Sequence, residues 1–347
     1  MLQVEPYGRA GLSPLRTPRL DFLVVGMPRS GTTLVQRLAA EIPGVVMPPE
    51  THFFPRLGEG LLGGRAAGLD RAALHRALVA YATHPDCAGL GVDVDAVMAT
   101  LDPCGCTVLD VFGALCAQLA GASGPRLGEK TPDHLDWWYP LWRADPRIRF
   151  IAVVRDPRAA VSSNLATWWA DAPWTAAWAG RKHLMFAVGW RRREGLIRRL
   201  EATAGRRVLT LKYEHVVADP DRSRAAIARF LEMDGSAGHR EAPARMVLPW
   251  ESWKREALGP VDAARAARWR HNGRLSASEA EEVTLLCAAG MLRRGYRLEP
   301  SAHWAQAAVG VARTARLLRA GTIMERDRQR RIDASDLSVR FGKAGSR

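Results

Sequence analysis

The chain has 347 residues and a net charge of +14, because 50 basic side chains outnumber 36 acidic ones. A hydrophobic content of 47% and a charged content of 25% are typical of a soluble globular protein with one large domain or two small ones. The positive charge favours anionic ligands, but the arginines are scattered and no nucleic-acid-binding motif accompanies them, so we expect no nucleic acid partner.

Cysteine usage and hydropathy limit where the protein works. The five cysteines are odd in number and irregularly spaced, which argues against a disulfide framework and indicates reduced thiols in the cytoplasm. Cys104 and Cys106 have no second Cys or His pair at ligand spacing, so we expect no metal there. The sequence has no signal peptide and no apolar stretch of about 18 residues, so we expect a cytoplasmic protein without a membrane span.

The first elements of the chain predict a phosphate-binding loop. Residues 1–20 form an irregular lead-in, and the apolar run 21–25 is a predicted strand. The glycine-containing loop 26–33 and a segment with helical apolar spacing follow, which is the order of a P-loop. Loop N–H groups and the helix dipole would bind an anion. An NTPase loop reads G-x-x-x-x-G-K-[ST], whereas here Thr32 takes the lysine position and the cation has moved upstream to Arg29.

A second short strand, residues 44–47, leads into a loop that carries Glu50 and His52. Two prolines before Glu50 disfavour helix there. Both side chains therefore follow the carboxyl end of a strand, where open α/β sheets place ligands and catalytic groups. The glycine-rich residues 56–68 predict a mobile surface loop.

The remainder of the chain alternates between predicted helices and strands. Helices are expected at residues 70–83, 107–120, 137–142, 180–202, 220–231, 276–292, where a capping box begins the helix, and 302–320. Strands are expected at residues 127–133, where the strand breaks into a turn, 149–154 and 207–212. This order predicts an α/β fold of the P-loop type, a three-layer sandwich with roughly five parallel strands and helices on both faces. We expect a main domain at 21–299 and a basic helix and tail at 300–347.

Two motifs resemble the cofactor site of a known family. Residues 28–34, Pro-Arg-Ser-Gly-Thr-Thr-Leu, resemble the 5′-phosphosulfate loop of sulfotransferases that use 3′-phosphoadenosine 5′-phosphosulfate (PAPS). This version of the loop is similar to that of the tyrosylprotein and glycosaminoglycan branch and its bacterial relatives. Residues 154–163 resemble the 3′-phosphate motif of the same family. Two phosphate motifs at two strand ends, in the right order, argue against a chance match.

The resemblance implies roles for individual residues. The co-substrate PAPS leaves the reaction as adenosine 3′,5′-bisphosphate (PAP). At its 5′-phosphosulfate the resemblance places Arg29, Ser30, Gly31, Thr32 and Thr33. It places Arg155 and Ser163 at the 3′-phosphate, Tyr213 near the nucleotide, and Arg268 with Trp269 where they close over the 3′-phosphate. It also implies metal-independent, in-line transfer of a sulfuryl group to a hydroxyl.

The catalytic residues that the resemblance implies are Glu50, Arg29 and Lys130. Glu50 lies in a Pro-Glu-Thr sequence at the place of the family's general base, and His52 is the rival for that role. Lys130 lies in a turn similar to the family's lysine-bearing turn, and with Arg29 it would stabilise charge on the leaving oxygen.

Other interpretations stay open at this point. A P-loop kinase or NTPase using ATP and magnesium is the first alternative, and a non-catalytic nucleotide- or nucleic-acid-binding protein is the second. The acceptor could be a peptide tyrosine, a sugar, a lipid or a secondary metabolite, with a small molecule or glycoside favoured. Trp168 and Trp169 are candidates for a wall of its pocket, and the basic residues from Arg181 to Arg199 are interpreted mainly as a solvated face. The sequence also leaves open a homodimer.

Overall fold

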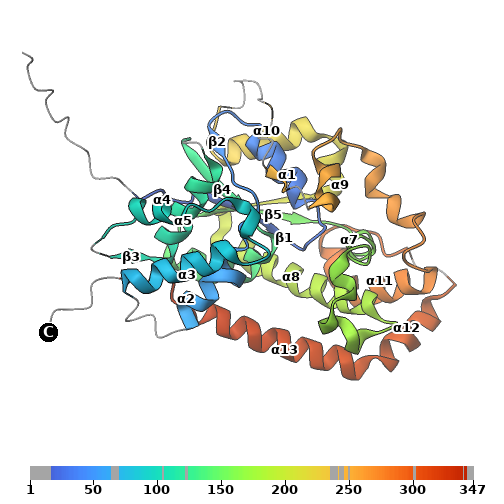
Figure 1. Ribbon diagram of the computed structural model, residues 1–347. Coiled ribbons are helices and arrows are strands. Elements are labelled where there is room, and N and C mark those ends of the chain that lie inside the picture. Colours follow the sequence, from blue (N-terminus) through green and yellow to red (C-terminus); the bar gives the residue numbers. More distant parts are fainter. Residues whose placement is uncertain are drawn as a thin grey trace, which may run out of the picture.

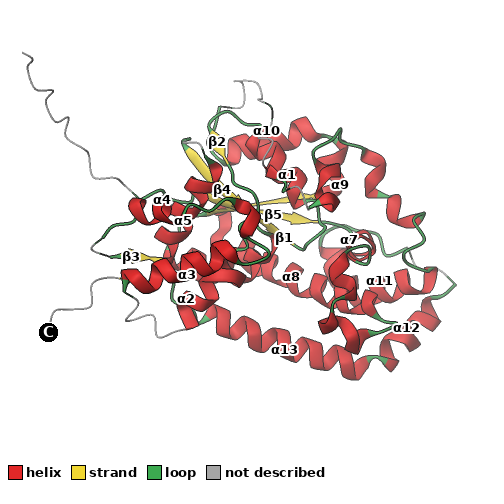
Figure 2. Cartoon of the chain, viewed as in Figure 1, coloured by secondary structure: helices red, strands yellow, loops and turns green. Residues whose placement is uncertain are grey.

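The core of the protein is a five-stranded parallel sheet with the strand order β2-β4-β1-β5-β6. Figure 2 shows the strands at the centre with helices around them. The computed structural model describes residues 17–63, 70–103, 105–121, 124–234, 241, 246–248, 251–299, 302–338 and 340–341. The expectations for residues 1–16, for Cys104 and for the end of the tail at 342–347 fall outside the described residues. The predicted α/β fold with five parallel strands is confirmed.

The strands lie close to their predicted positions. Their bounds are Phe22–Gly26 for β1, Val45–Val46 for β2, Arg126–Lys130 for β4, Arg149–Val154 for β5 and Val208–Lys212 for β6. Strands β1 and β5 are fully buried, as expected for central strands covered on both faces. Successive side chains alternate between two clusters, with Leu23 and Phe150 in one and Phe22 and Ile151 in the other.

Helices cover both faces of the sheet (Figure 1). One face packs against α1 (Thr32–Ala40), α9 (Tyr213–Ala218) and α10 (Pro220–Phe230). The other face packs against α3 (Arg71–Thr83), α4 (Val94–Thr100), α5 (Val108–Ala120), α6 (Trp138–Ala144) and α8 (Lys182–Ala204). Short 3₁₀ segments link these elements, at Ala88–Leu90, Pro132–Trp137, Trp168–Asp171, Pro173–Trp178, Gly205–Arg207, Ser252–Ala257, Ala263–Ala266 and Arg268–Arg270.

A third apolar cluster lies beside the end of β1. It joins Met27 to α7 (Pro157–Asn164), to the first half of α8 and to α11 (Ala277–Arg293). The capping box predicted for α11 is present, because Ser276 accepts from the backbone of Glu279 and the Glu279 carboxylate accepts from Ser276 N. This cluster holds α7, and so the end of β5, next to the phosphate loop.

The prediction of a mobile surface loop at 56–68 was wrong for the described residues. Phe54–Gly58 forms a π-helical turn and α2 covers Glu59–Gly63. Leu57 and Leu61 are buried in the main core, four residues apart on one helical face. The glycine content of the segment concealed this apolar spacing. Residues 64–69 lie outside the described part.

The C-terminal segment is more ordered than predicted. Instead of one helix at 302–320 and a polar tail, α12 (Trp304–Arg313) and α13 (Ala315–Asp333) follow each other, and α13 runs alongside α8 (Figure 1). Ile332 and Leu337 are buried in the main core. A short β7 (Arg340–Phe341) pairs with β3 (Cys106–Thr107). Within the described ranges, no helix is long and apolar enough to cross a lipid bilayer.

The interpretation of the basic stretch in α8 as a solvated face was wrong for two of its arginines. Arg192 donates to Asp136, which is almost fully buried, and Arg193 forms an ion pair with Asp133. The partners lie in the segment Pro132–Trp137, which periodicity along α8 could not reveal.

Candidate active site

The phosphate loop connects β1 to α1. Arg29 has a φ of 70° and Gly31 a φ of 92°, so the loop turns through the left-handed region twice before α1 begins at Thr32. A Cβ atom on Gly31 would lie 2.2 Å from the Tyr213 ring, so only glycine fits. The first turn of α1 thus opens towards the carboxyl edge of the sheet, where its N–H groups can bind an anion.

Arg155 follows β5, the strand next to β1, and the register of the sheet brings it beside the loop. Its guanidinium lies over the Tyr213 ring at 4.2 Å from the centroid. Nη1 donates to the Arg29 carbonyl at 3.0 Å, and Nη2 donates to the Arg265 carbonyl at 3.3 Å. Burial lowers the pKa of Arg155, which means that the charged guanidinium is poorly solvated and favours an anionic partner.

The predicted Ser163 lies on α7 and contacts the phosphate loop. Arg29 Nε donates to Ser163 Oγ at 3.1 Å, and Asn164 Nδ2 donates to the Pro28 carbonyl at 3.0 Å. Burial also lowers the pKa of Arg29. The residues expected at the 5′-phosphosulfate and at the 3′-phosphate therefore form one connected group.

Glu50 lies at the other side of the loop, between two lysines. Lys130 Nζ pairs with Oε1 and also donates to Thr33 Oγ1 at 3.3 Å. Lys254 Nζ lies 2.7 Å from Oε2, and His52 Nε2 lies 3.5 Å from the same oxygen. The structure thus brings together Glu50, Lys130 and His52, which the sequence singled out.

A buried network fixes the loop that carries Glu50. The backbone N and the hydroxyl of Thr51 donate to Glu129 Oε1 at 3.2 and 2.9 Å, and Thr131 Oγ1 donates to it at 2.6 Å. His134 Nδ1 lies 2.8 Å from the other Glu129 oxygen. Because β2 and β4 are neighbours, Glu129 and Lys130 at the end of β4 hold the residues that follow β2.

The lysines control the protonation of Glu50. Burial by itself would raise the pKa of Glu50, but Lys130 and Lys254 outweigh it and hold this pKa well below its usual range. Burial lowers the pKa of Lys130 to about 8, although Glu50 opposes the shift. Both groups are charged at neutral pH.

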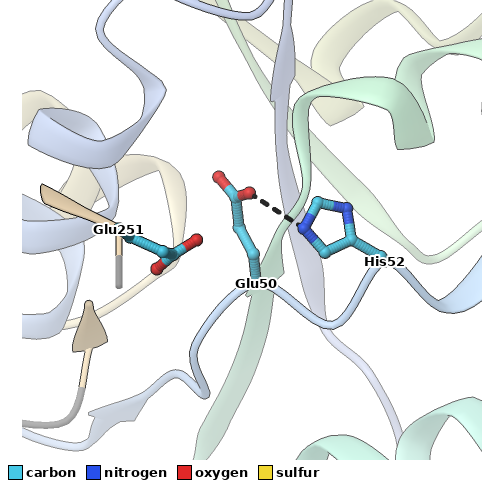
Figure 3. Close-up of side chains that lie close together, drawn as sticks. All are labelled: Glu50, His52 and Glu251. Carbon is cyan, nitrogen blue, oxygen red and sulfur yellow. Dashed lines mark ion pairs between the residues drawn. The ribbon is translucent and has the colours of Figure 1, made fainter. Parts of the chain in front are cut away.

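Figure 3 shows Glu50 between His52 and Glu251, with the His52 ring turned towards the Glu50 carboxylate. The ligand atoms of these three residues lie within 4.8 Å of one another, a spacing that a metal ion could use. However, Lys254 pairs with both carboxylates, and Lys130 pairs with Glu50 as well. Two ammonium groups at the carboxylates make the cluster a poor cation site.

One pocket of about 1200 Å³ is lined by Glu50, His52, Lys254 and Arg155, whereas the almost fully buried Lys130 is not among its lining residues. This volume exceeds the range of about 300–1000 Å³ usual for one small ligand, so a nucleotide and an acceptor have room together. The predicted residues that line it are Arg29, Gly31, Thr32, Thr33, Glu50, Arg155, Ser163, Tyr213 and Arg268. Arg268 lies at the rim with a half-exposed side chain and pairs with Asp262 and Glu256 of its own segment. Trp269 lies within 4.9 Å of the Arg158 guanidinium.

Three buried polar atoms around the loop fit an anionic ligand. Ser30 Oγ, Arg155 Nε and Arg265 Nε are buried and have no hydrogen-bond partner in the protein. Buried donors without partners are costly, and phosphate oxygens would satisfy them. The residues present therefore fit a nucleotide that carries phosphate groups.

Sequence reasoning missed Lys254, Glu251 and Arg265 as residues of the site. They lie between residues 251 and 266, in 3₁₀ turns without a periodic apolar pattern. In this segment the chain returns to the carboxyl edge of the sheet, far along the sequence from the phosphate loop and Glu50. No local signal in the sequence marks that contact.

Comparison with known proteins identifies the family. A sequence model of the sulfotransferase family matches residues 21–236, more than half of the chain. The chain belongs to the sulfotransferase family. The matched range contains both phosphate motifs, Glu50 and Lys130, and ends before the segment that carries Lys254.

The fold is shared with a solved sulfotransferase domain, and a second solved sulfotransferase is similar at a lower score. The sulfotransferase domain of the Synechococcus PCC 7002 olefin synthase is 21% identical, with a TM-score of 0.51 over 81% of this chain and 96% of that one. Sulfotransferase STF9 from Mycobacterium avium is 16% identical, with a TM-score of 0.41 over 83% of this chain and 79% of that one. A comparison with curated protein sequences finds no significant match.

Proposed function

We propose that this sulfotransferase moves the sulfuryl group of PAPS to an acceptor hydroxyl, without a metal ion and with Glu50 as general base. The observation that supports this most is the position of Glu50 between two lysines, one of which, Lys130, also donates to Thr33 of the phosphate loop. The Glu50 carboxylate, which can take a proton, lines one pocket with Arg29, Arg155 and Lys254, and Lys130 is buried beside Glu50.

In the proposed reaction, the acceptor oxygen bonds to sulfur while the bond between sulfur and the 5′-phosphate oxygen breaks. The hydroxyl proton passes to the Glu50 carboxylate, a role worth about 10²–10⁴-fold in rate. PAP leaves with the electron pair of the broken bond. Arg29 and Lys130 stabilise the negative charge that develops on its 5′-phosphate.

The two lysines also determine when Glu50 can act as a base. While Lys130 and Lys254 pair with it, Glu50 is ionised but binds a proton weakly, because its pKa is held low. Anionic groups of a bound nucleotide would attract both ammonium groups and weaken the pairs with Glu50. The pKa of Glu50 would then rise, so we propose that it becomes an effective base only when PAPS is bound.

The remaining predicted residues are proposed to bind the nucleotide. Thr32, Thr33 and the loop N–H groups would hold the 5′-phosphosulfate, and Ser30 Oγ is a buried donor beside them. Arg155 and Ser163 would hold the 3′-phosphate, with Tyr213 supporting Arg155 through its ring. Arg268 would approach from the rim.

His52 is the second candidate base. Its Nε2 lies 3.5 Å from Glu50 Oε2, its side chain lines the pocket, and its backbone has a φ of 48°, a strained conformation that is common at functional sites. Hydrogen bonding to Glu50 would instead make it a positioning residue. We therefore propose Glu50 as the first candidate for the general base and His52 as the second.

Calorimetry with PAP in the presence of EDTA tests the co-substrate and separates it from ATP. We expect PAP to bind without metal, and Arg155→Ala to weaken PAP about 10- to 100-fold while changing adenosine 5′-phosphate little, as expected for a lost charge-assisted contact to the 3′-phosphate. Arg268→Ala is the matched control and should cost less, because Arg268 is half-exposed at the rim. A requirement for magnesium would favour the kinase alternative, and equal losses for both ligands would refute the role of Arg155.

A further inference from the structure

One wall of the pocket carries large exposed aromatic side chains. Trp168 and Trp174 line the pocket and are 64% and 63% exposed, which is unusual for tryptophan. Trp168 packs edge-to-face on Trp169, and Trp169 Nε1 donates to Asn164 Oδ1, at the end of α7. The Trp168 ring is thus held, through Trp169, against the element that contacts the phosphate loop.

The aromatic wall continues along α8 towards Lys130. Met185, Gly189 and Arg193 are spaced by four residues, so they share one face of α8, and all three line the pocket. Arg193 pairs with Asp133, three residues after Lys130. This face therefore extends the pocket wall from the tryptophans towards the segment that follows Lys130.

The charged side chains on this wall are paired with each other. Arg56 pairs with Asp86, and Arg193 with Asp133. Glu325 of α13, which also lines the pocket, lies 3.1 Å from Arg192 Nε. Among the described residues of this wall, these cations are thus compensated by neighbouring carboxylates. An anionic acceptor would find no excess positive charge here.

Gly189 leaves space in the wall. It lies in the interior of α8, where glycine is less stable than alanine. A Cβ atom at this position would meet only Arg193 Nη1, at 3.5 Å. The pocket is therefore wider at Gly189 than an ordinary helix face would make it.

We propose that the acceptor is an uncharged phenol or aryl alcohol whose ring packs against Trp168 and Trp174. The inference rests on the proposed sulfuryl transfer and adds the acceptor class. Flat apolar rings gain most from exposed tryptophans, because an aromatic pair is stabilised beyond the apolar area that it buries. Met185 and Phe186 extend the apolar surface. The products are an aryl sulfate ester and PAP, with the phenolic proton on Glu50.

An acceptor panel tests the class with the full chain and labelled PAPS. The probes are naphthol, an uncharged alkyl glucoside, a desulfated heparin oligosaccharide and an acidic peptide that contains tyrosine. We expect kcat/KM to be highest for naphthol. A higher value for the glucoside, the oligosaccharide or the peptide would overturn the inference while leaving the transfer reaction in place. Absence of PAP binding would remove the proposed function itself.

Variants of the wall provide a second readout. Trp168→Ala and Trp174→Ala should each raise the KM for naphthol about 2- to 10-fold and leave the Kd of PAP unchanged. Leu292→Ala removes an apolar side chain that is 61% exposed outside the pocket, and it should change neither value. Equal effects on PAP and naphthol would place the tryptophans at the nucleotide and contradict the inference.

Filling the space at Gly189 tests the shape of the site. Gly189→Leu should raise the KM for naphthol more than that for phenol, because the larger ring needs the space, whereas Gly189→Ala should have a small effect. If Gly189→Leu changed both acceptors equally, or neither, Gly189 would not border the acceptor.

Discussion

Lys130 is the residue whose environment most constrains the chemistry. It is almost fully buried, pairs with Glu50 and donates to Thr33 of the phosphate loop. A lysine in this position costs solvation energy, which is why its pKa is lowered to about 8. It is the kind of group that gains from a bound anion, and it titrates close to physiological pH.

The titration of Lys130 leads to an expected pH dependence. In the free enzyme, Lys130 carries its charge below pH of about 8 and loses it above, so kcat/KM for PAPS should fall as the pH rises through this value. Bound anion raises this pKa, so kcat should fall only at higher pH. Lys130→Arg should abolish the alkaline loss, because arginine stays charged. The same loss in the variant would assign it to another group.

Sequence reasoning reached the residues of the site whose motifs are local. Glu50 follows β2 and Lys130 ends β4, and the pattern of each strand and its turn is visible within ten residues. Lys254 also pairs with Glu50, but it lies about 200 residues after Glu50 in the sequence, in a 3₁₀ turn. Its position depends on the path of the whole chain, which no local pattern encodes.

At the scale of elements, the phosphate loop and α9 support each other. Tyr213 begins α9, closes over Gly31 and lies under the Arg155 guanidinium. The loop after β1, the residue after β5 and the helix after β6 therefore meet at one ring. This contact couples the two proposed phosphate sites.

Gly31→Ala should disrupt that contact. The new Cβ would lie 2.2 Å from the Tyr213 ring, at a φ of 92° that alanine avoids, so we expect a loss of about 1–3 kcal/mol in stability. Displacement of Tyr213 should also weaken PAP binding. Gly60→Ala in α2, whose Cβ meets nothing within 4 Å, is the control: it should leave PAP binding unchanged and should not lower stability, because alanine is favoured over glycine in a helix. Thermal unfolding and calorimetry give the two values, and a fully active, equally stable Gly31→Ala protein would contradict the account.

For the whole molecule, α13 acts as a brace across α8 and the segment after Lys130. Asp136 is almost fully buried and accepts from Arg192 at 2.7 Å and from Arg328 of α13 at 2.5 Å. Gln329 donates to the Asp136 carbonyl at 2.7 Å. Burial would raise the pKa of Asp136, but the arginines outweigh it and lower this pKa to about 2.

Asp136→Ala should therefore be strongly destabilising. The substitution removes the buried carboxylate partner of the Arg192 guanidinium, and breaking a buried ion pair typically costs about 3 kcal/mol of stability. The control is Asp327→Ala in α13, which removes an exposed partner of Arg330 and should cost less than about 0.5 kcal/mol of stability. Urea unfolding of both variants measures the difference. Similar stability of the two would show that α13 is not a brace.

The sequence allowed prediction of the sheet and of most helices, because buried parallel strands and amphipathic helices leave strong periodic patterns. It failed where burial arises from distant partners. Leu57 and Leu61 lie in a glycine-rich segment, and α13 is so rich in arginine that it resembles a tail. In both cases, side chains from elsewhere in the chain supply the environment that orders the helix.

The central claim is that Glu50 takes the acceptor proton in PAPS-dependent transfer. The most direct test compares transfer from labelled PAPS by the native protein, Glu50→Gln and His52→Asn, with PAP affinity measured for each. We expect Glu50→Gln to lose at least about 10²-fold in kcat with PAP binding nearly unchanged, and His52→Asn to keep most of its turnover. Turnover by Glu50→Gln at the native rate would contradict the claim.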